Sequence, residues 1–186
     1  MTKLSKGISN WLYRQGAIEK DEIDLYEYAV YCFIITIAPL IMALLCSAMI
    51  GGIKQCISIL IPFMLLRQYS GGYHAKNVWF CMISSFLTII ILVWIAMNDI
   101  GGIVHWSLLA VSVIVIIKSS PIESDNRKLD EKEKVEYHKK AKIILFVFLM
   151  LEIILNVIGL TIYANSIGIG IIMVAFSQVL YFIKSN

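Results

Sequence analysis

His74 and Cys81 are the two side chains best suited to chemistry in this sequence, and they lie close together along the chain. A thiol acts as a nucleophile in its thiolate form, which a neighbouring imidazole or a helix N-terminus favours. His74 can supply the imidazole, and a helix that begins near Asn77 can supply the N-terminus. The pair therefore indicates covalent catalysis, with Cys81 as the nucleophile and His74 as the general base.

This chemistry requires the chain to fold back between the two residues. If residues 74–81 formed one straight helix, His74 and Cys81 would stand about 10.5 Å apart along its axis. A nucleophile and its base must approach to roughly 3–4 Å. Gly71 and Gly72 allow such a turn, because glycine adopts backbone angles that other residues avoid. We therefore predict that Cys81 lies in the first two turns of a helix with His74 folded over it; a solvated His74 near an inert thiol is the alternative.

The elements that position this loop belong to a membrane protein. Hydrophobic residues make up 59% of the 186 positions and charged residues only 16%, whereas soluble domains contain about 25% charged residues. The charges concentrate in 1–27 and 118–142. This pattern predicts an all-α, polytopic helix bundle that forms one integral membrane domain over residues 1–186. Clustered lysines without interleaved aromatic residues argue against nucleic-acid binding.

About six transmembrane segments are expected. Their predicted bounds are 28–50, 53–66, 78–97, 103–117, 141–163 and 167–183. The second is short and contains Pro62, so it either extends through Tyr69 or re-enters the same side. Before them, residues 4–18 predict an amphipathic helix. It either lies on the membrane surface, with Trp11 at headgroup level, or packs against one end of the bundle.

Charge asymmetry predicts the orientation. With six alternating spans and a cytoplasmic N-terminus, all of the 16 lysines and arginines except Lys54 lie on the cytoplasmic side, as the positive-inside rule requires. Both termini and the catalytic loop 67–81 are then cytoplasmic. The stretch 118–142 is expected to be a solvated loop with a short helix from Asp130. Two ion pairs would stabilise that helix, Asp130–Lys134 and Glu136–Lys140, and its lysines could contact membrane lipid.

The loop also resembles a family signature. Arg67, the run Gly71-Gly72-Tyr73-His74 and Cys81 are similar to the motif of the accessory gene regulator B (AgrB) family, which comprises quorum-sensing, peptide-processing membrane cysteine peptidases of Gram-positive bacteria. The resemblance implies a small AgrD-type precursor peptide as the partner, which is cut near its C-terminal tail. Cys81 would form an acyl-enzyme thioester, His74 would move the proton, and a thiolactone or lactone ring would close on the precursor.

Five further residues are candidates for supporting roles. Arg67 either pairs with the acidic tail of the precursor or anchors the helix at the interface. Gly72 serves the turn, while Lys76 and Asn77 are candidates for orienting His74 or stabilising an oxyanion. Glu152, an ionisable residue inside an apolar segment, either orients His74 or makes a structural hydrogen bond. For the latter, the candidate partners in the third segment are Ser84, Ser85 and Thr88.

Two other function classes compete with a peptidase. A small transporter fits six spans with a buried glutamate, and a non-catalytic membrane scaffold fits any such bundle. The three histidines are too dispersed to suggest a metal site, and no cofactor is expected. Small residues in the last two segments, such as Gly168 and Gly170, suggest a homodimer as a further hypothesis.

Overall fold

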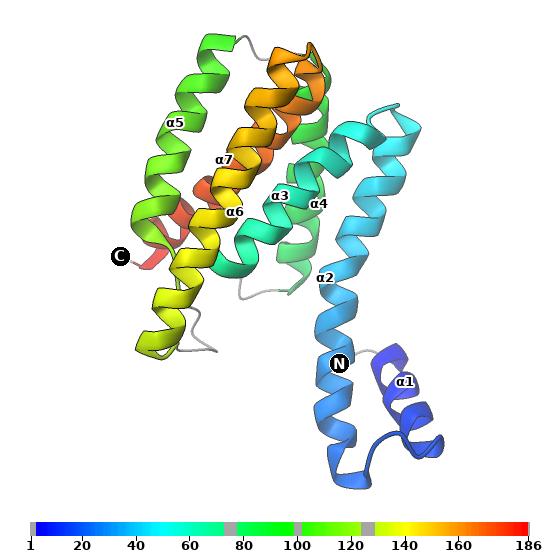
Figure 1. Cartoon of the computed structure of the whole chain (residues 1–186). Helices are drawn as coiled ribbons and strands as arrows, with labels where there is room; N and C mark the ends of the chain where they lie inside the picture. Colours follow the sequence, from blue (N-terminus) through cyan, green and yellow to red (C-terminus); the bar gives the residue numbers. More distant parts are fainter. Residues whose placement is uncertain (1–2, 73–77, 99–101, 124–128, 186) are drawn as a thin grey trace.

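The chain is α-helical throughout the part that the computed structural model describes, which is residues 3–72, 78–98, 102–123 and 129–185. Predicted residues His74, Lys76 and Asn77 lie outside the described residues. The elements are α1 (Lys3–Arg14), a 3-10 turn (Lys20–Glu22), α2 (Ile23–Met49), α3 (Ile53–Ser70), α4 (Val78–Asn98), α5 (Gly102–Ser119), α6 (Glu131–Val157) and α7 (Thr161–Ser185) (Figure 1). The prediction of an all-α protein is confirmed.

The helices from α2 to α7 alternate in direction (Figure 1). The C-terminal ends of α3 and α5 and the N-terminal ends of α4 and α6 therefore lie at one end of the bundle, which we call the loop end. Helix α7 packs against α3, α4, α5 and α6. It supplies buried side chains to both apolar clusters of the core, Ile171 and Val174 to one and Ile169 to the other. Any group that α7 presents at the loop end is thus held by a rigid, central element.

Four helical stretches are long and apolar enough to cross a membrane. They are Lys20–Met49, Trp79–Asn98, Gly102–Ser119 and Thr161–Lys184. Helix α3 carries Lys54 and Arg67 within its 18 residues, and the apolar part of α6 carries Lys142 and Glu152. A multi-pass membrane protein is supported, while the count of six spans stays a prediction.

Several predicted segment boundaries differ from the helix ends. The predicted start of the sixth segment at 167 is wrong, because α7 begins at Thr161. Helix α3 continues through Pro62 to Ser70, which confirms the longer alternative for the second segment. The predicted segment 141–163 is wrong at its C-terminal end, because α6 ends at Val157. Gly159 has a φ of 84° there, the left-handed conformation with which helices commonly end.

Helix α1 packs along the N-terminal half of α2 (Figure 1). The contact buries Ser5 and Ser9, while Leu4 and Trp11 remain exposed. Small side chains thus lie buried in the contact, whereas Leu4 and Trp11 point away from it. The helix packs against the protein, and its outward apolar side agrees with the predicted position at a membrane surface, which stays a prediction.

Gly168 and Gly170 of α7 pack closely against other helices of the same chain. A Cβ at Gly170 would lie 2.5 Å from the Ile59 carbonyl oxygen, and one at Gly168 would lie 2.5 Å from His105 Cε1. Both glycines are buried, because they let α3 and α5 approach α7 closely. They therefore offer no surface for the suggested homodimer.

Candidate active site

The C-terminal end of α3 places Arg67 and a glycine turn at the loop end. The Gly71 amide donates a hydrogen bond to the Arg67 carbonyl at 3.1 Å. Gly71 and Gly72 then adopt φ values of 71° and 148°, which favour glycine. A Cβ at Gly72 would lie 2.5 Å from Arg67 Nη1 and 2.6 Å from Ser177 Oγ. Gly72 thus serves both the turn and a close approach to the arginine.

Arg67 is held by contacts with its own helix and with α7. Its Nη1 donates a hydrogen bond to Ser177 Oγ at 2.6 Å, and its guanidinium lies over the Phe63 ring, 5.7 Å from the ring centroid. The end of α3, which carries Arg67, lies at the loop end together with the start of α4. Cys81 is half-buried in the first turn of α4, which begins at Val78 as the sequence predicts. The cation and the thiol therefore belong to the same region.

A buried amide of α7 joins the glycine turn to the segment that follows α5. Gln178 Nε2 donates one hydrogen bond to the Ser70 carbonyl and one to Ser120 Oγ, both at 3.1 Å. The Ile122 amide donates to the same Ser70 carbonyl at 2.9 Å, beyond a cis Ser120–Pro121 peptide bond. His138 Nδ1 donates to the Ser120 carbonyl at 2.7 Å. Four segments thus meet around the end of α3.

A cavity of about 250 Å³ opens beside this junction. Its lining combines the end of α3, the residues after α5 and the first turns of α6. The lining residues are Arg67, Gln68, Tyr69, Gly71, Gly72, Pro121, Ile122, Glu123, Leu129 and Tyr137. The Tyr69 and Tyr137 rings meet edge to face with centroids 5.6 Å apart. The cavity therefore offers a cation, aromatic surface and glycine backbone to a ligand.

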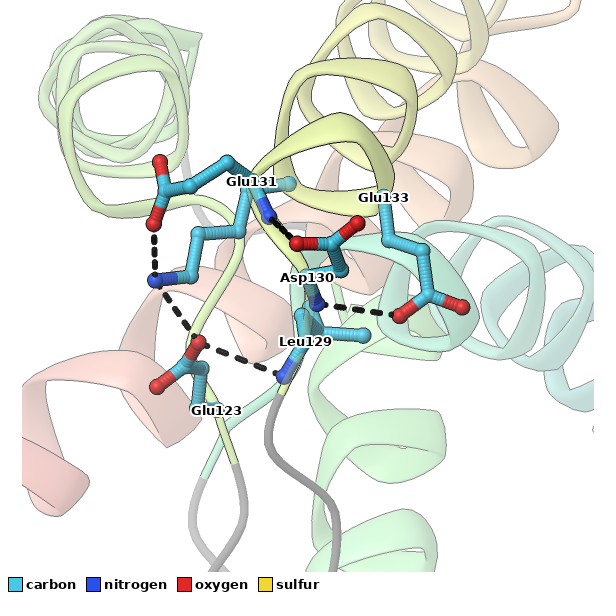
Figure 2. Close-up of polar contacts among 6 residues, drawn as sticks. Glu123, Leu129, Asp130, Glu131 and Glu133 are labelled. Atoms are coloured by element: carbon cyan, nitrogen blue, oxygen red, sulfur yellow. Dashed lines mark hydrogen bonds and ion pairs between the residues drawn. The ribbon is translucent and has the colours of Figure 1, made fainter.

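The start of α6 forms part of the cavity wall and is held by a capping box (Figure 2). The Asp130 carboxylate accepts a hydrogen bond from the Glu131 amide at 2.8 Å, and the Asp130 amide donates to Glu133 at 3.1 Å. Lys134 pairs with Glu123 at 3.0 Å and with Glu131 at 2.9 Å. The predicted Asp130–Lys134 pair is wrong, because the cap uses the Asp130 carboxylate.

The second predicted ion pair of this region is present. Lys140 Nζ lies 2.6 Å from Glu136 Oε1, and the same ammonium lies over the Tyr69 ring, 5.5 Å from its centroid. The hydrogen bond from Lys140 lowers the pKa of the exposed Glu136 carboxyl below its ordinary value. The helix predicted from Asp130 is present, but the prediction that it is short is wrong, because it runs without a break into the apolar part of α6.

Glu152 lies at the other end of the bundle. Its Oε1 is 2.6 Å from His105 Nε2, and both side chains are buried. Helix α6 rises about 22 Å between Tyr137 at the cavity and Glu152. The predicted hydrogen bonds to Ser84, Ser85 or Thr88 are replaced by this pairing across Gly168. Glu152 is therefore a structural group remote from the cavity, and sequence alone does not reveal that His105 in α5 faces it.

The structure places three of the predicted site residues at the loop end, namely Arg67, Gly72 and Cys81, and it brings Arg67 and Gly72 into close contact. Sequence reasoning missed Ser177, Gln178 and Ser120, which contact Arg67 or the glycine turn. One signal for them existed. Ser177 and Gln178 are adjacent polar residues near the end of an apolar helix, and polar side chains in a span often mark function.

Comparison with known proteins assigns the family. The sequence profile described as accessory gene regulator B matches residues 5–178. The accessory gene regulator protein B of Staphylococcus saprophyticus is 23% identical over 170 residues, which cover 86% of this chain and 86% of that protein. That of Staphylococcus intermedius is 33% identical over 91 residues, or 48% of each chain.

An AgrB-like protein 2 of Clostridium perfringens strain 13 is 22% identical over 172 residues, which cover 88% of this chain and 78% of that protein. No solved structure matches this chain at a comparable level of significance. The profile match includes all the residues of the site described above, from Arg67 to Gln178. The chain belongs to the accessory gene regulator B (AgrB) family, and this membership implies a role in autoinducer processing.

Proposed function

We propose that this protein is a membrane cysteine endopeptidase that cleaves the C-terminal tail of a small AgrD-type precursor peptide. The observation that carries the proposal is the placement of Arg67, the Gly71–Gly72 turn and Cys81 at the loop end, where the arginine and both glycines line a cavity. A half-buried thiol at a helix start, at the same end of the bundle as a fixed guanidinium, suits a cysteine nucleophile. Membership of a family that processes autoinducers provides the substrate class.

The first half of the reaction forms a thioester. Cys81 Sγ attacks the carbonyl carbon of the scissile peptide bond while His74 accepts the thiol proton. The tetrahedral oxyanion then collapses, the carbon–nitrogen bond breaks, and His74 protonates the leaving amine. The C-terminal fragment departs, and the N-terminal part of the precursor remains bound to Cys81 as an acyl group.

The second half closes a ring on the precursor. A thiol or hydroxyl of the bound peptide attacks the thioester carbonyl, and Cys81 leaves with the proton that this nucleophile releases. The product is a thiolactone or a lactone, and Cys81 is regenerated. Ring closure competes with hydrolysis only where water is excluded, and a site at the membrane edge favours that exclusion.

Arg67 has a defined role in this mechanism. The guanidinium of Arg67 stabilises negative charge on the sulfur, or binds a carboxylate of the acidic tail, without leaving Ser177. Lys76 and Asn77, which follow His74, are proposed to assist in orienting the imidazole or in binding the oxyanion. The site faces the cytoplasm in this proposal, because nearly all lysines and arginines would then lie inside.

Co-expression with the precursor tests the function. The size of the precursor is followed by mass spectrometry in cells that carry wild type, Cys81→Ala or His74→Ala. We expect tail removal with wild type and none with either variant. A membrane transporter would tolerate Cys81→Ala, so wild-type processing by that variant would contradict the proposal.

A further inference from the structure

We infer that Ser177 and Gln178 of α7 are positioning residues, which hold Arg67 and the turn at residues 70–72 in their working geometry. The inference rests on the proposed peptidase function and extends it to a helix far along the chain from the motif. The two residues touch groups of the site without having to touch the precursor themselves. They can hold these groups in place because α7, the central helix of the bundle, is itself packed against α3, α4, α5 and α6.

Ser177 fixes the arginine. Its hydroxyl donates a hydrogen bond to the Val174 carbonyl at 2.7 Å, so its oxygen is left to accept from Arg67 Nη1 at 2.6 Å. The missing side chain of Gly72 provides the space for this contact. A guanidinium carries five donors in a rigid plane, so one fixed contact to α7 also sets the direction of the remaining donors.

Gln178 fixes the turn. Its side chain is fully buried, and its amide nitrogen donates to both Ser70 and Ser120 at 3.1 Å. These two acceptors are chain neighbours of lining residues: Ser70 lies between Tyr69 and Gly71, and Ser120 precedes Pro121. One amide group therefore sets the distance between two strips of backbone that a bound peptide would contact.

The geometry links this junction to Cys81. The end of α3, which carries Arg67 and the turn, and the start of α4, which carries Cys81, both lie at the loop end. If Ser177 or Gln178 loses its hydrogen bonds, the cation and the turn gain freedom relative to the thiol. Misplacement by about 1 Å near a reacting centre costs roughly a hundredfold in rate, so an effect on turnover is expected rather than one on binding alone.

The test uses the purified full chain in lipid nanodiscs with the precursor peptide. Ser177→Ala and Gln178→Met are expected to lower kcat by roughly tenfold or more, with a smaller change in KM. Alkylation of Cys81 by iodoacetamide, followed by peptide mass spectrometry, is expected to slow severalfold in Ser177→Ala. Ser177→Thr keeps the hydroxyl and is expected to restore both rates.

Ser166→Ala is the matched control. Ser166 is also a buried serine of α7, whose hydroxyl donates to the Ile162 carbonyl, but it lies three turns from Ser177. Its variant is expected to cleave and alkylate as wild type does. Rates are taken per folded molecule, and if Gln178→Met fails to fold, the Ser177→Ala and Ser177→Thr pair decides.

Different results would overturn the positioning role and the proposed peptidase function. If wild type cleaves the precursor and both Ser177→Ala and Gln178→Met match it in kcat and in Cys81 alkylation, the positioning role is overturned and the peptidase stands. If wild type leaves the precursor intact under conditions in which cells process it, the proposed function is overturned and the positioning role falls with it.

Discussion

At the scale of single residues, Gly72 connects the glycine turn directly to the arginine. A Cβ there would lie within 2.6 Å of both Arg67 Nη1 and Ser177 Oγ, at a φ of 148°. Gly72→Ala is therefore expected to displace the arginine and lower precursor cleavage by roughly tenfold or more. The rate of precursor processing by purified protein, per folded molecule, measures this effect.

Gly102→Ala provides the control for the glycine substitution. Gly102 begins α5, and a Cβ there meets nothing within 4 Å. This variant is expected to process the precursor at the wild-type rate. Equal activity of Gly72→Ala and Gly102→Ala would mean that the close approach of Arg67 to the turn has no catalytic importance.

At the scale of elements, the pair between His105 and Glu152 holds α5 against α6. Both side chains are buried and joined at 2.6 Å. His105→Ala leaves the Glu152 carboxyl buried without that partner, which is expected to cost about 1–2 kcal/mol of stability. Thermal unfolding in detergent measures this cost. The control is Ser107→Ala, which replaces an exposed serine of α5.

The same variant separates a structural role from a catalytic one. Because the pair lies about 22 Å along α6 from the cavity, cleavage per folded molecule is expected to stay at the wild-type level in His105→Ala. A loss of cleavage at unchanged stability would place Glu152 in the catalytic machinery after all.

The first turn of α6 is stabilised by an N-cap, and the contribution of this cap to stability can be measured. Asp130 caps the helix through the Glu131 amide at 2.8 Å. Asp130→Ala is expected to cost about 1 kcal/mol and to fray the first turn, whereas Asp130→Ser keeps a capping oxygen. Hydrogen exchange of the amides at 131–134 tests this, and equal protection in both variants would show that the cap is dispensable.

Much of the element pattern could be predicted from local sequence. The apolar segments, the helix start at Val78 and the Glu136–Lys140 pair all follow from rules that act within a few residues. The end of α6 could also have been predicted, because Gly159 is a standard helix stop. The longer apolar run through residue 163 concealed it.

The assembly of the site could not be predicted in this way. Arg67 and Ser177 meet across 110 positions of sequence, and Gln178 reaches Ser70 across 108. Such contacts depend on how helices rotate and cross, which periodicity does not determine. The partner of Glu152 was missed for the same reason: His105 faces it only because Gly168 of α7 leaves room.

At the scale of the whole molecule, the alternating directions of helices α2 to α7 predict the side of the membrane on which each connecting segment lies. If all six cross the membrane, Lys54 and Lys132 lie on opposite sides; both are exposed. Single Lys54→Cys and Lys132→Cys variants, in a chain whose own cysteines are replaced by alanine, are labelled in intact cells with an impermeant maleimide. We expect labelling at position 54 and none at 132 before permeabilisation.

A different labelling pattern would revise the count of spans. If only the four most apolar stretches cross, position 132 would lie outside and react in intact cells. That outcome would also move the cavity at the start of α6 to the outer face, so the proposed cytoplasmic site depends on this result.

The central claim is that Cys81 carries the precursor as a thioester. Purified protein is mixed with precursor, quenched in acid and examined by mass spectrometry for an adduct at Cys81. We expect an adduct with the mass of the precursor without its C-terminal tail. Hydroxylamine should remove this adduct, and Cys81→Ala should lack it. Tail removal that proceeds equally in Cys81→Ala, with no adduct at this thiol in wild type, would contradict the claim.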